Sequence, residues 1–148
     1  PLCLTKEDMV TWTEDPQEYI RRDMDVMEDF HDPRLAATSF LFDLVKIRTG
    51  DCLPLTLGII NDVFVNYAKA PPENRNYFGK EAAMRMLGGL SKLLLSEQKY
   101  RQPVEQAITQ HVLPEFKSRF GFLRARACGV IGCYAMLEYK NQQAFAMG

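Results

Sequence analysis

Residues 83–90 of the chain read AMRMLGGL, and they repeat the apolar spacing of residues 37–44, which read ATSFLFDL. In both stretches apolar side chains fall at positions i, i+3, i+4 and i+7, which is the spacing of one face of an α-helix. A second helical pattern begins at Pro54 and recurs from Pro103, and a further copy of the first pattern begins at Ala127. The sequence therefore predicts a pair of helices that is repeated along the chain.

A two-helix unit of roughly 40 to 47 residues is the period of HEAT and armadillo arrays, in which each unit buries its apolar face by stacking on its neighbours. No stretch with strict strand alternation and no Asn-Gly or Asp-Gly hairpin occurs in the sequence. The predicted fold is therefore an all-α, armadillo-like solenoid. Its expected units are residues 16–31 (partial), 32–70, 77–118 and 121–148 (partial).

Proline and capping residues mark the expected helix ends. Asp15 before Pro16 and Asp32 before Pro33 each place a capping carboxylate ahead of a proline at the first helical position. Pro114 lies inside a helical pattern and is expected to kink or end that helix, because it lacks an amide donor. The helices are expected at about residues 16–30, 33–46, 54–69, 80–96, 103–113 and 121–139.

The Gly88-Gly89 pair interrupts the expected helix over residues 80–96. Each glycine costs roughly 1 kcal/mol relative to alanine in an exposed helix. Two readings remain open: a close approach by a neighbouring helix, or a local kink.

The bulk composition is ordinary. The chain has 148 residues, 47% of them hydrophobic, and a formal net charge of −1. No apolar run is long enough to cross a bilayer, so a soluble protein is expected. The first residue is not methionine and neither end looks like a polar cap, which suggests a piece of a longer chain. The four dispersed cysteines, Cys3, Cys52, Cys128 and Cys133, are expected to be reduced core thiols of an intracellular protein.

Charge is distributed unevenly along the chain. Residues 1–32 hold ten acidic and three basic side chains, whereas the remainder holds nine acidic and fifteen basic ones. Within the acidic block four carboxylates share one helical face, and they form a candidate surface for a basic partner. The alternative is a solvated outer surface, the commoner meaning of a charge run. The four residues are Asp25, Glu28, Asp29 and Asp32.

The sequence offers no convergent set of catalytic groups. His31 and His111 are the only histidines, and neither has metal-ligand neighbours at a recognised spacing. A cysteine activated by His111 and a phosphate cradle at the glycine pair are both disfavoured by the helical context. We therefore expect no enzyme activity, no metal and no cofactor. The basic residues Lys117, Arg119, Arg124 and Arg126 are better explained by ion pairs within the array than by nucleic-acid binding.

Four ordered blocks resemble a known family. Residues 14–21, EDPQEYIR, resemble the D-P-x-E-Y-I-R signature of the importin-beta superfamily of nuclear transport receptors. The stretch over residues 27–37, then QHVLPEF at 110–116 and LRARAC at 123–128, look like further blocks of the branch that contains importins seven and eight. An exportin of the cellular-apoptosis-susceptibility type shares the first element, but the LRARAC block favours the importin branch.

The resemblance implies a right-handed superhelix of HEAT repeats and a central part of a longer receptor. Such a receptor carries cargo through nuclear pores under control of the small GTPase Ran, and it shuttles between nucleus and cytoplasm. The implied partners are Ran, through the full-length receptor, basic protein cargo and nuclear pore proteins, with no membrane insertion and no direct nucleic-acid binding. The rival interpretation is a HEAT-repeat scaffold in a signalling or coat complex, which the repeat alone fits equally well.

Overall fold

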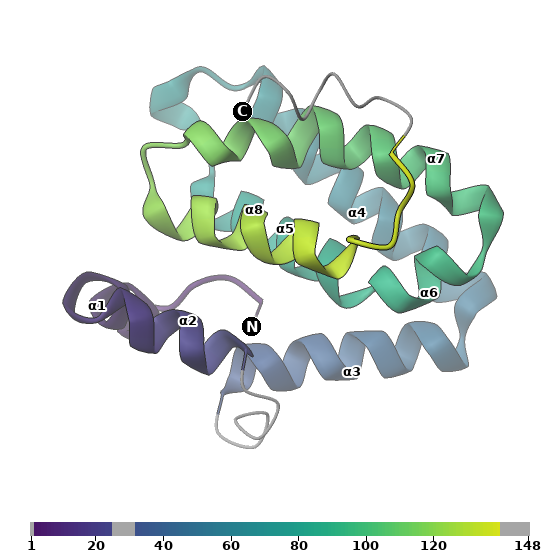
Figure 1. The fold of residues 1–148 in the computed structure, drawn as a ribbon, viewed down its shortest axis with the longest axis horizontal. Coiled ribbons are helices and arrows are strands. Elements are labelled where there is room, and N and C mark those ends of the chain that lie inside the picture. Colours follow the sequence, from purple (N-terminus) through teal and green to yellow (C-terminus); the bar gives the residue numbers. More distant parts are fainter. Residues whose placement is uncertain (1, 25–31, 140–148) are drawn as a thin grey trace.

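The computed structural model describes residues 2–24 and 32–139, and in these residues all secondary structure is helical (Figure 1). The all-α prediction is confirmed there, with no strand between residues 32 and 139. The α-helices are α1 (Lys6–Glu14), α2 (Pro16–Met24), α3 (Pro33–Ile47), α4 (Thr49–Lys69), α5 (Tyr77–Gly89), α6 (Ser91–Ser96), α7 (Gln98–Ala107) and α8 (Gly121–Cys133). Three shorter helical segments are η2 (Pro72–Asn74), the π-helical turn η3 (Ile108–Val112) and η4 (Leu113–Lys117).

The helices are arranged in two layers. Helix α5 packs against α3 on one side and α8 on the other, while α4 lies behind α5 (Figure 1). The run from α7 through η3 and η4 lies next to α8. It also lies beside α4, where Phe64 of α4 contacts His111 of η3. This stacking of helix pairs is the arrangement expected of a HEAT-type solenoid.

Helix α5 forms the centre of the core. Every residue from 80 to 87 is buried, because α5 is enclosed by α3, α4 and α8. One continuous apolar cluster runs through the stacked helices and includes Val45 of α3, Phe64 of α4, Leu87 of α5 and Leu123 of α8. The interior is therefore shared between units, as a solenoid requires.

The predicted inward faces of α3 and α4 are partly wrong. Phe40 is 69% exposed, and Leu44, Leu55 and Ile59 are exposed as well. Helix α3 packs chiefly against α4 and α5, so much of its circumference faces solvent. In α4 the structure buries Phe64 and Tyr67 of the expected pattern, but it buries Leu53, Thr56 and Ile60 in place of Leu55 and Ile59.

Several predicted helix ends move by about one turn. Helices α4 and α7 begin at Thr49 and Gln98, about one turn before the expected starts at Pro54 and Pro103. Pro54 and Pro103 each stand inside their helix, at its sixth residue. A proline this close to the N-terminus removes only one main-chain hydrogen bond, and the turn before it still forms. The expected helix over residues 16–30 is described only as far as residue 24, and α8 ends at Cys133 rather than near residue 139.

The expected disruption at Pro114 is confirmed. The α-helical pattern of α7 ends at Ala107, continues as the π turn of η3 and then tightens into the 3₁₀ helix of η4, which contains Pro114. Because proline cannot donate the next helical hydrogen bond, the chain changes pitch around it.

The glycine pair combines close packing with a break. A Cβ on Gly89 would lie 2.9 Å from the Cγ2 atom of Thr38, and one on Gly88 would lie 3.7 Å from both Val130 and Cys133. Glycine therefore lets α3 approach α5 at this point. The helix also ends there, because α5 stops at Gly89 and α6 begins at Ser91.

We expect Gly89→Ala to lower the free energy of unfolding by about 1 kcal/mol, since overpacking outweighs the gain in helix propensity. Thr38 cannot easily turn away, because its side chain is β-branched and its hydroxyl donates to the Arg34 carbonyl at 2.8 Å. The matched control is Gly58→Ala in α4, where no atom lies within 4 Å of the added Cβ. That change should stabilise the protein by roughly 0.5–1 kcal/mol in urea titrations. Stabilisation by both changes would contradict the close contact.

The cysteines are not core residues, contrary to expectation. All four are free thiols, but Cys3, Cys128 and Cys133 are exposed and Cys52 is half-buried. Helix α8 turns Leu123, Ala127 and Val130 inward, and Cys128 and Cys133 flank this buried face on either side.

Candidate functional site

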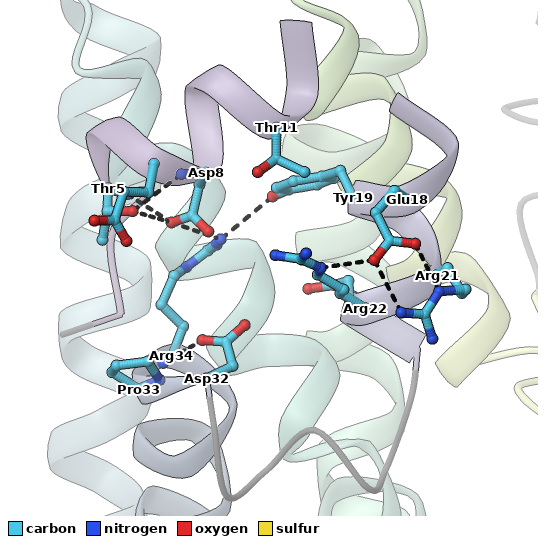
Figure 2. Close-up of a pocket in the computed structure, with 12 residues that line it drawn as sticks. Thr5, Asp8, Thr11, Glu18, Tyr19, Arg21, Arg22, Asp32, Pro33 and Arg34 are labelled. Atoms are coloured by element: carbon cyan, nitrogen blue, oxygen red, sulfur yellow. Dashed lines mark hydrogen bonds and ion pairs between the residues drawn. The ribbon is translucent and has the colours of Figure 1, made fainter. Parts of the chain in front are cut away.

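A hollow of about 360 Å³ lies where α1, α2 and the start of α3 meet (Figure 2). Charged side chains dominate its lining. The acidic ones are Glu7, Asp8, Glu18, Asp23 and Asp32, and the basic ones are Arg21, Arg22 and Arg34.

One wall of the hollow is an exposed ion-paired group on α2. Arg21 Nε donates to one carboxylate oxygen of Glu18 at 2.7 Å, and Arg22 Nε donates to the other at 2.8 Å. These hydrogen bonds lower the pKa of Glu18 to about 2. Because the three side chains are substantially exposed, the pairs orient the wall but add little to stability.

Arg34 forms the floor of the hollow. Its side chain is only 2% exposed, and its guanidinium donates to the Tyr19 hydroxyl at 3.3 Å. It also lies 3.4 Å from Asp8 and donates to Glu81 at 2.8 Å. Arg34, which belongs to α3, therefore connects α1, α2 and α5 through its guanidinium.

Behind the floor, Glu81 and Asp23 join the remaining arginines. The Glu81 side chain is fully buried and accepts a 2.7 Å hydrogen bond from Arg126 Nε. Arg126 also donates to Asp23 at 2.7 Å, and Arg85 donates to the same Asp23 oxygen. This buried charge cluster, which comprises Asp8, Asp23, Arg34, Glu81, Arg85 and Arg126, connects five α-helices.

The electrostatics of the buried charge cluster favour its ionised form. Burial alone would raise the pKa of Asp23, but Arg126 and Arg85 outweigh it and bring the pKa to about 2. The pKa of Arg126 is raised, because Glu81 and Asp23 overcome the effect of its burial. Three cations thus balance three carboxylates at the junction of the helices.

Among the four candidate carboxylates, the structure describes Asp32 alone. Its Oδ1 atom accepts hydrogen bonds from the amides of Arg34 at 2.7 Å and Leu35 at 3.4 Å, so it caps α3. The half-buried side chain also lines the hollow. Asp25, Glu28 and Asp29 lie outside the described residues, so their shared face stays a prediction.

His111 has a packing role. Its ring stacks on Phe64, with centroids 5.0 Å apart, and so lies between α4 and η3. Burial and the nearby Lys80 lower its pKa, which favours the neutral ring. His31 lies outside the described residues. Within residues 2–24 and 32–139, no three His, Cys, Asp or Glu side chains are grouped so as to hold a metal ion.

The basic residues near the end of the chain have different surroundings. Arg126 belongs to the buried charge cluster, which confirms the expected ion pairing for that residue. Arg124 donates to the Ser118 carbonyl at 2.8 Å, and Arg119 lies over the ring of Phe120. In the part of the chain that the structure describes, no helix is long and apolar enough to span a membrane.

The buried partners of Arg126 could not be predicted from the sequence. Glu81 and Arg85 are four residues apart inside an apolar stripe, and Arg34 opens α3 directly after its cap. Charged residues at helix positions that should face the core were the signal in the sequence that could have indicated buried ion pairs. Their pairing was not visible, because the partners lie 45 to 103 residues apart.

Comparison with known proteins gives relatives over almost the whole chain. An importin beta-like SAD2 homolog of Arabidopsis thaliana is 36% identical over 145 residues, which are 98% of this chain and 14% of the relative. Importin-8 of Mus musculus is 30% identical over 141 residues, or 95% of this chain and 13% of that protein. A probable importin-7 homolog of Dictyostelium discoideum is 27% identical over 146 residues, again 98% of this chain and 14% of the relative.

No family model and no solved structure matches the chain. The chain spans about one seventh of the length of the relatives named above. Those relatives are importins, and together they cover the blocks whose resemblance was noted in the sequence. The sequence of this chain therefore fits part of a protein of the importin-7 and importin-8 branch.

Proposed function

We propose that the chain acts as part of a nuclear transport receptor, which binds protein cargo and carries it through nuclear pores under control of Ran. The observation that carries the proposal is the similarity to importins along nearly the whole chain. Stacked helix pairs suit this role, because an array whose units contact only their neighbours bends at low cost and can wrap a partner. The proposed receptor acts by binding and releasing its partners, with no covalent bond made or broken.

A pull-down with full-length protein tests Ran control. GTP-locked Ran should be retained and GDP-bound Ran should not, because the proposed receptor exchanges its cargo in response to the nucleotide state. A scaffold of a signalling or coat complex should ignore both forms. Failure to retain GTP-locked Ran would therefore favour the scaffold.

We further propose that Asp25, Glu28, Asp29 and Asp32 contribute to a surface for basic cargo. The support is the charge of residues 1–32, where ten acidic side chains outnumber three basic ones. Such an excess attracts basic proteins and speeds their association. Asp32 contributes while capping α3, since its Oδ2 atom makes no capping bond. The division into the four HEAT units given above is part of the same proposal.

We expect the chain to bind a histone-like or ribosomal-protein-like basic protein with an affinity that falls as salt rises, because surface charges are screened over about 10 Å at 0.1 M salt. The triple change Asp25→Asn, Glu28→Gln and Asp29→Asn should weaken this binding, measured by fluorescence anisotropy. Asp32 is left intact because its loss would uncap α3.

The matched control removes three exposed carboxylates elsewhere, with Asp51→Asn, Asp62→Asn and Glu73→Gln. An equal loss in both triple variants would show that only net charge matters. Binding that does not depend on salt, or no binding to a basic protein, would contradict the proposed surface.

A further inference from the structure

A second hollow, of about 350 Å³, lies between two connecting segments, the one from α4 to α5 and the one from η4 to α8. These two connections lie at the same end of the molecule (Figure 1). The hollow is distinct from the one beside α1 and α2. Its charged lining consists of Arg75, Lys117 and Arg119, with Glu115 as the one carboxylate.

Glu115 does not form an ion pair with Arg75 or Arg119, because it is engaged from the interior. It is buried and lies 3.8 Å from the Lys80 ammonium, while the Tyr67 hydroxyl donates to it at 3.4 Å. Lys80 is itself buried, with its ammonium 4.4 Å from the ring centroid of Phe64. Glu115 and Lys80 therefore form a buried pair of balanced charge below the floor.

The two arginines are held by aromatic rings instead of carboxylates. Arg75 lies over the Tyr67 ring with its Cζ atom 5.1 Å from the centroid, and Arg119 lies 5.5 Å over the Tyr77 ring. Within the described residues, neither guanidinium makes an ion pair. A guanidinium stacked on a ring keeps its in-plane N–H groups available for a carboxylate.

The rim of the hollow is braced before any ligand arrives. The Tyr77 hydroxyl donates to the Pro72 carbonyl at 2.8 Å, and Arg75 Nε donates to the Ala70 carbonyl at 3.1 Å. Both bonds hold the connection between α4 and α5 in one shape. A site that is already ordered loses less entropy on binding, so weak contacts count for more.

We propose that this basic and aromatic hollow binds an acidic peptide segment of a partner protein, with Arg75 and Arg119 holding its carboxylates and Lys117 adding charge at the edge. A single-stranded nucleic acid fits less well, because bases need open aromatic faces for stacking. Here the arginines cover the faces of Tyr67 and Tyr77. The exposed Pro72 and Pro114 on the rim offer apolar contact to a side chain between the acidic ones.

The probe is a fluorescent octapeptide with six glutamates around a central phenylalanine pair, compared with the same peptide in which glutamine replaces glutamate. The chain should bind the glutamate peptide at least tenfold more tightly, because hydrogen bonds between a guanidinium and a carboxylate are stronger than those to a neutral amide. Binding should weaken as salt rises. Equal affinity for both peptides would overturn the proposal, as would tighter binding of an eight-nucleotide oligothymidine at the same site.

The double variant Arg75→Gln/Arg119→Gln should lose the preference for the glutamate peptide. The matched control is Lys46→Gln/Lys92→Gln, which removes two exposed cations from other helices and should bind like the parent. If circular dichroism shows that the Arg75 change harms folding, Arg119→Gln alone tests the site, since Arg119 is exposed. If the control variant loses the same preference for the glutamate peptide, the effect is due to net charge alone and the assignment of the site is overturned. The peptide assay does not involve Ran, so its outcome is independent of the transport proposal.

Discussion

Replacement of Glu81 by glutamine should lower the free energy of unfolding by about 3–5 kcal/mol, because it removes one charge from a buried ion-pair network and leaves the opposite charges in place. Glu81 accepts from Arg34 at 2.8 Å and from Arg126 at 2.7 Å, and its side chain is fully buried. A glutamine amide has nearly the same shape, but its NH₂ group must face a guanidinium donor. Urea titrations followed by circular dichroism measure the change.

The control for this variant is Asp51→Asn. Asp51 forms a 2.8 Å ion pair with Arg48, but both side chains are exposed, so its loss should hardly change stability. A loss of less than about 1 kcal/mol for Glu81→Gln would mean that Asp8 and Asp23 satisfy the arginines without Glu81.

Replacement of Phe64 by alanine should lower the free energy of unfolding by about 3–5 kcal/mol, because it opens a cavity in the core. The Phe64 side chain is 1% exposed, stacks on His111 and lies under the Lys80 ammonium. The change therefore removes contacts between α4, α5 and η3 at once. Thermal and urea denaturation both report it.

Phe40→Ala is the matched control, since it deletes the same atoms from a side chain that is 69% exposed. Its effect on the stability of this chain should be small. Equal losses of unfolding free energy for the two variants would show that Phe40 is buried in solution, in contradiction to the structure.

Helix positions were predictable because their signals are local. The apolar spacing of residues 83–90 and the caps at Asp15 and Asp32 lie within one or two turns of the helices they mark. The caps at Thr5 and Asn76 are equally local, although α1, which follows Thr5, was not among the expected helices. The all-helical fold follows from such short-range features.

The choice of inward face was less predictable, because α4 is apolar on more than one side. Leu55 and Ile59 belong to the apolar pattern that recurs from Pro103, and Leu53 and Ile60 do not, yet the structure exposes the first two and buries the others. Only the positions of neighbouring helices decide between such stripes, and those positions are not written in the local sequence.

The sites show the same division. The capping role of Asp32 could be predicted from the proline that follows it. For Arg126 an ion pair within the array could be predicted, but not its partners. The partners of Arg126, and the presence of Arg75 and Arg119 in the lining of one hollow, depend on contacts between distant segments. The balance of charge in the buried cluster is therefore a property of the fold.

That balance also constrains how the protein can diverge. Asp23, Glu81, Arg85 and Arg126 are joined by hydrogen bonds and ion pairs, so a change at one of them alters the surroundings of the others. Such effects are not additive, because neighbouring residues in one network are coupled. Over evolutionary time these positions should be inherited or exchanged as a set, with single substitutions purged until a compensating one arises.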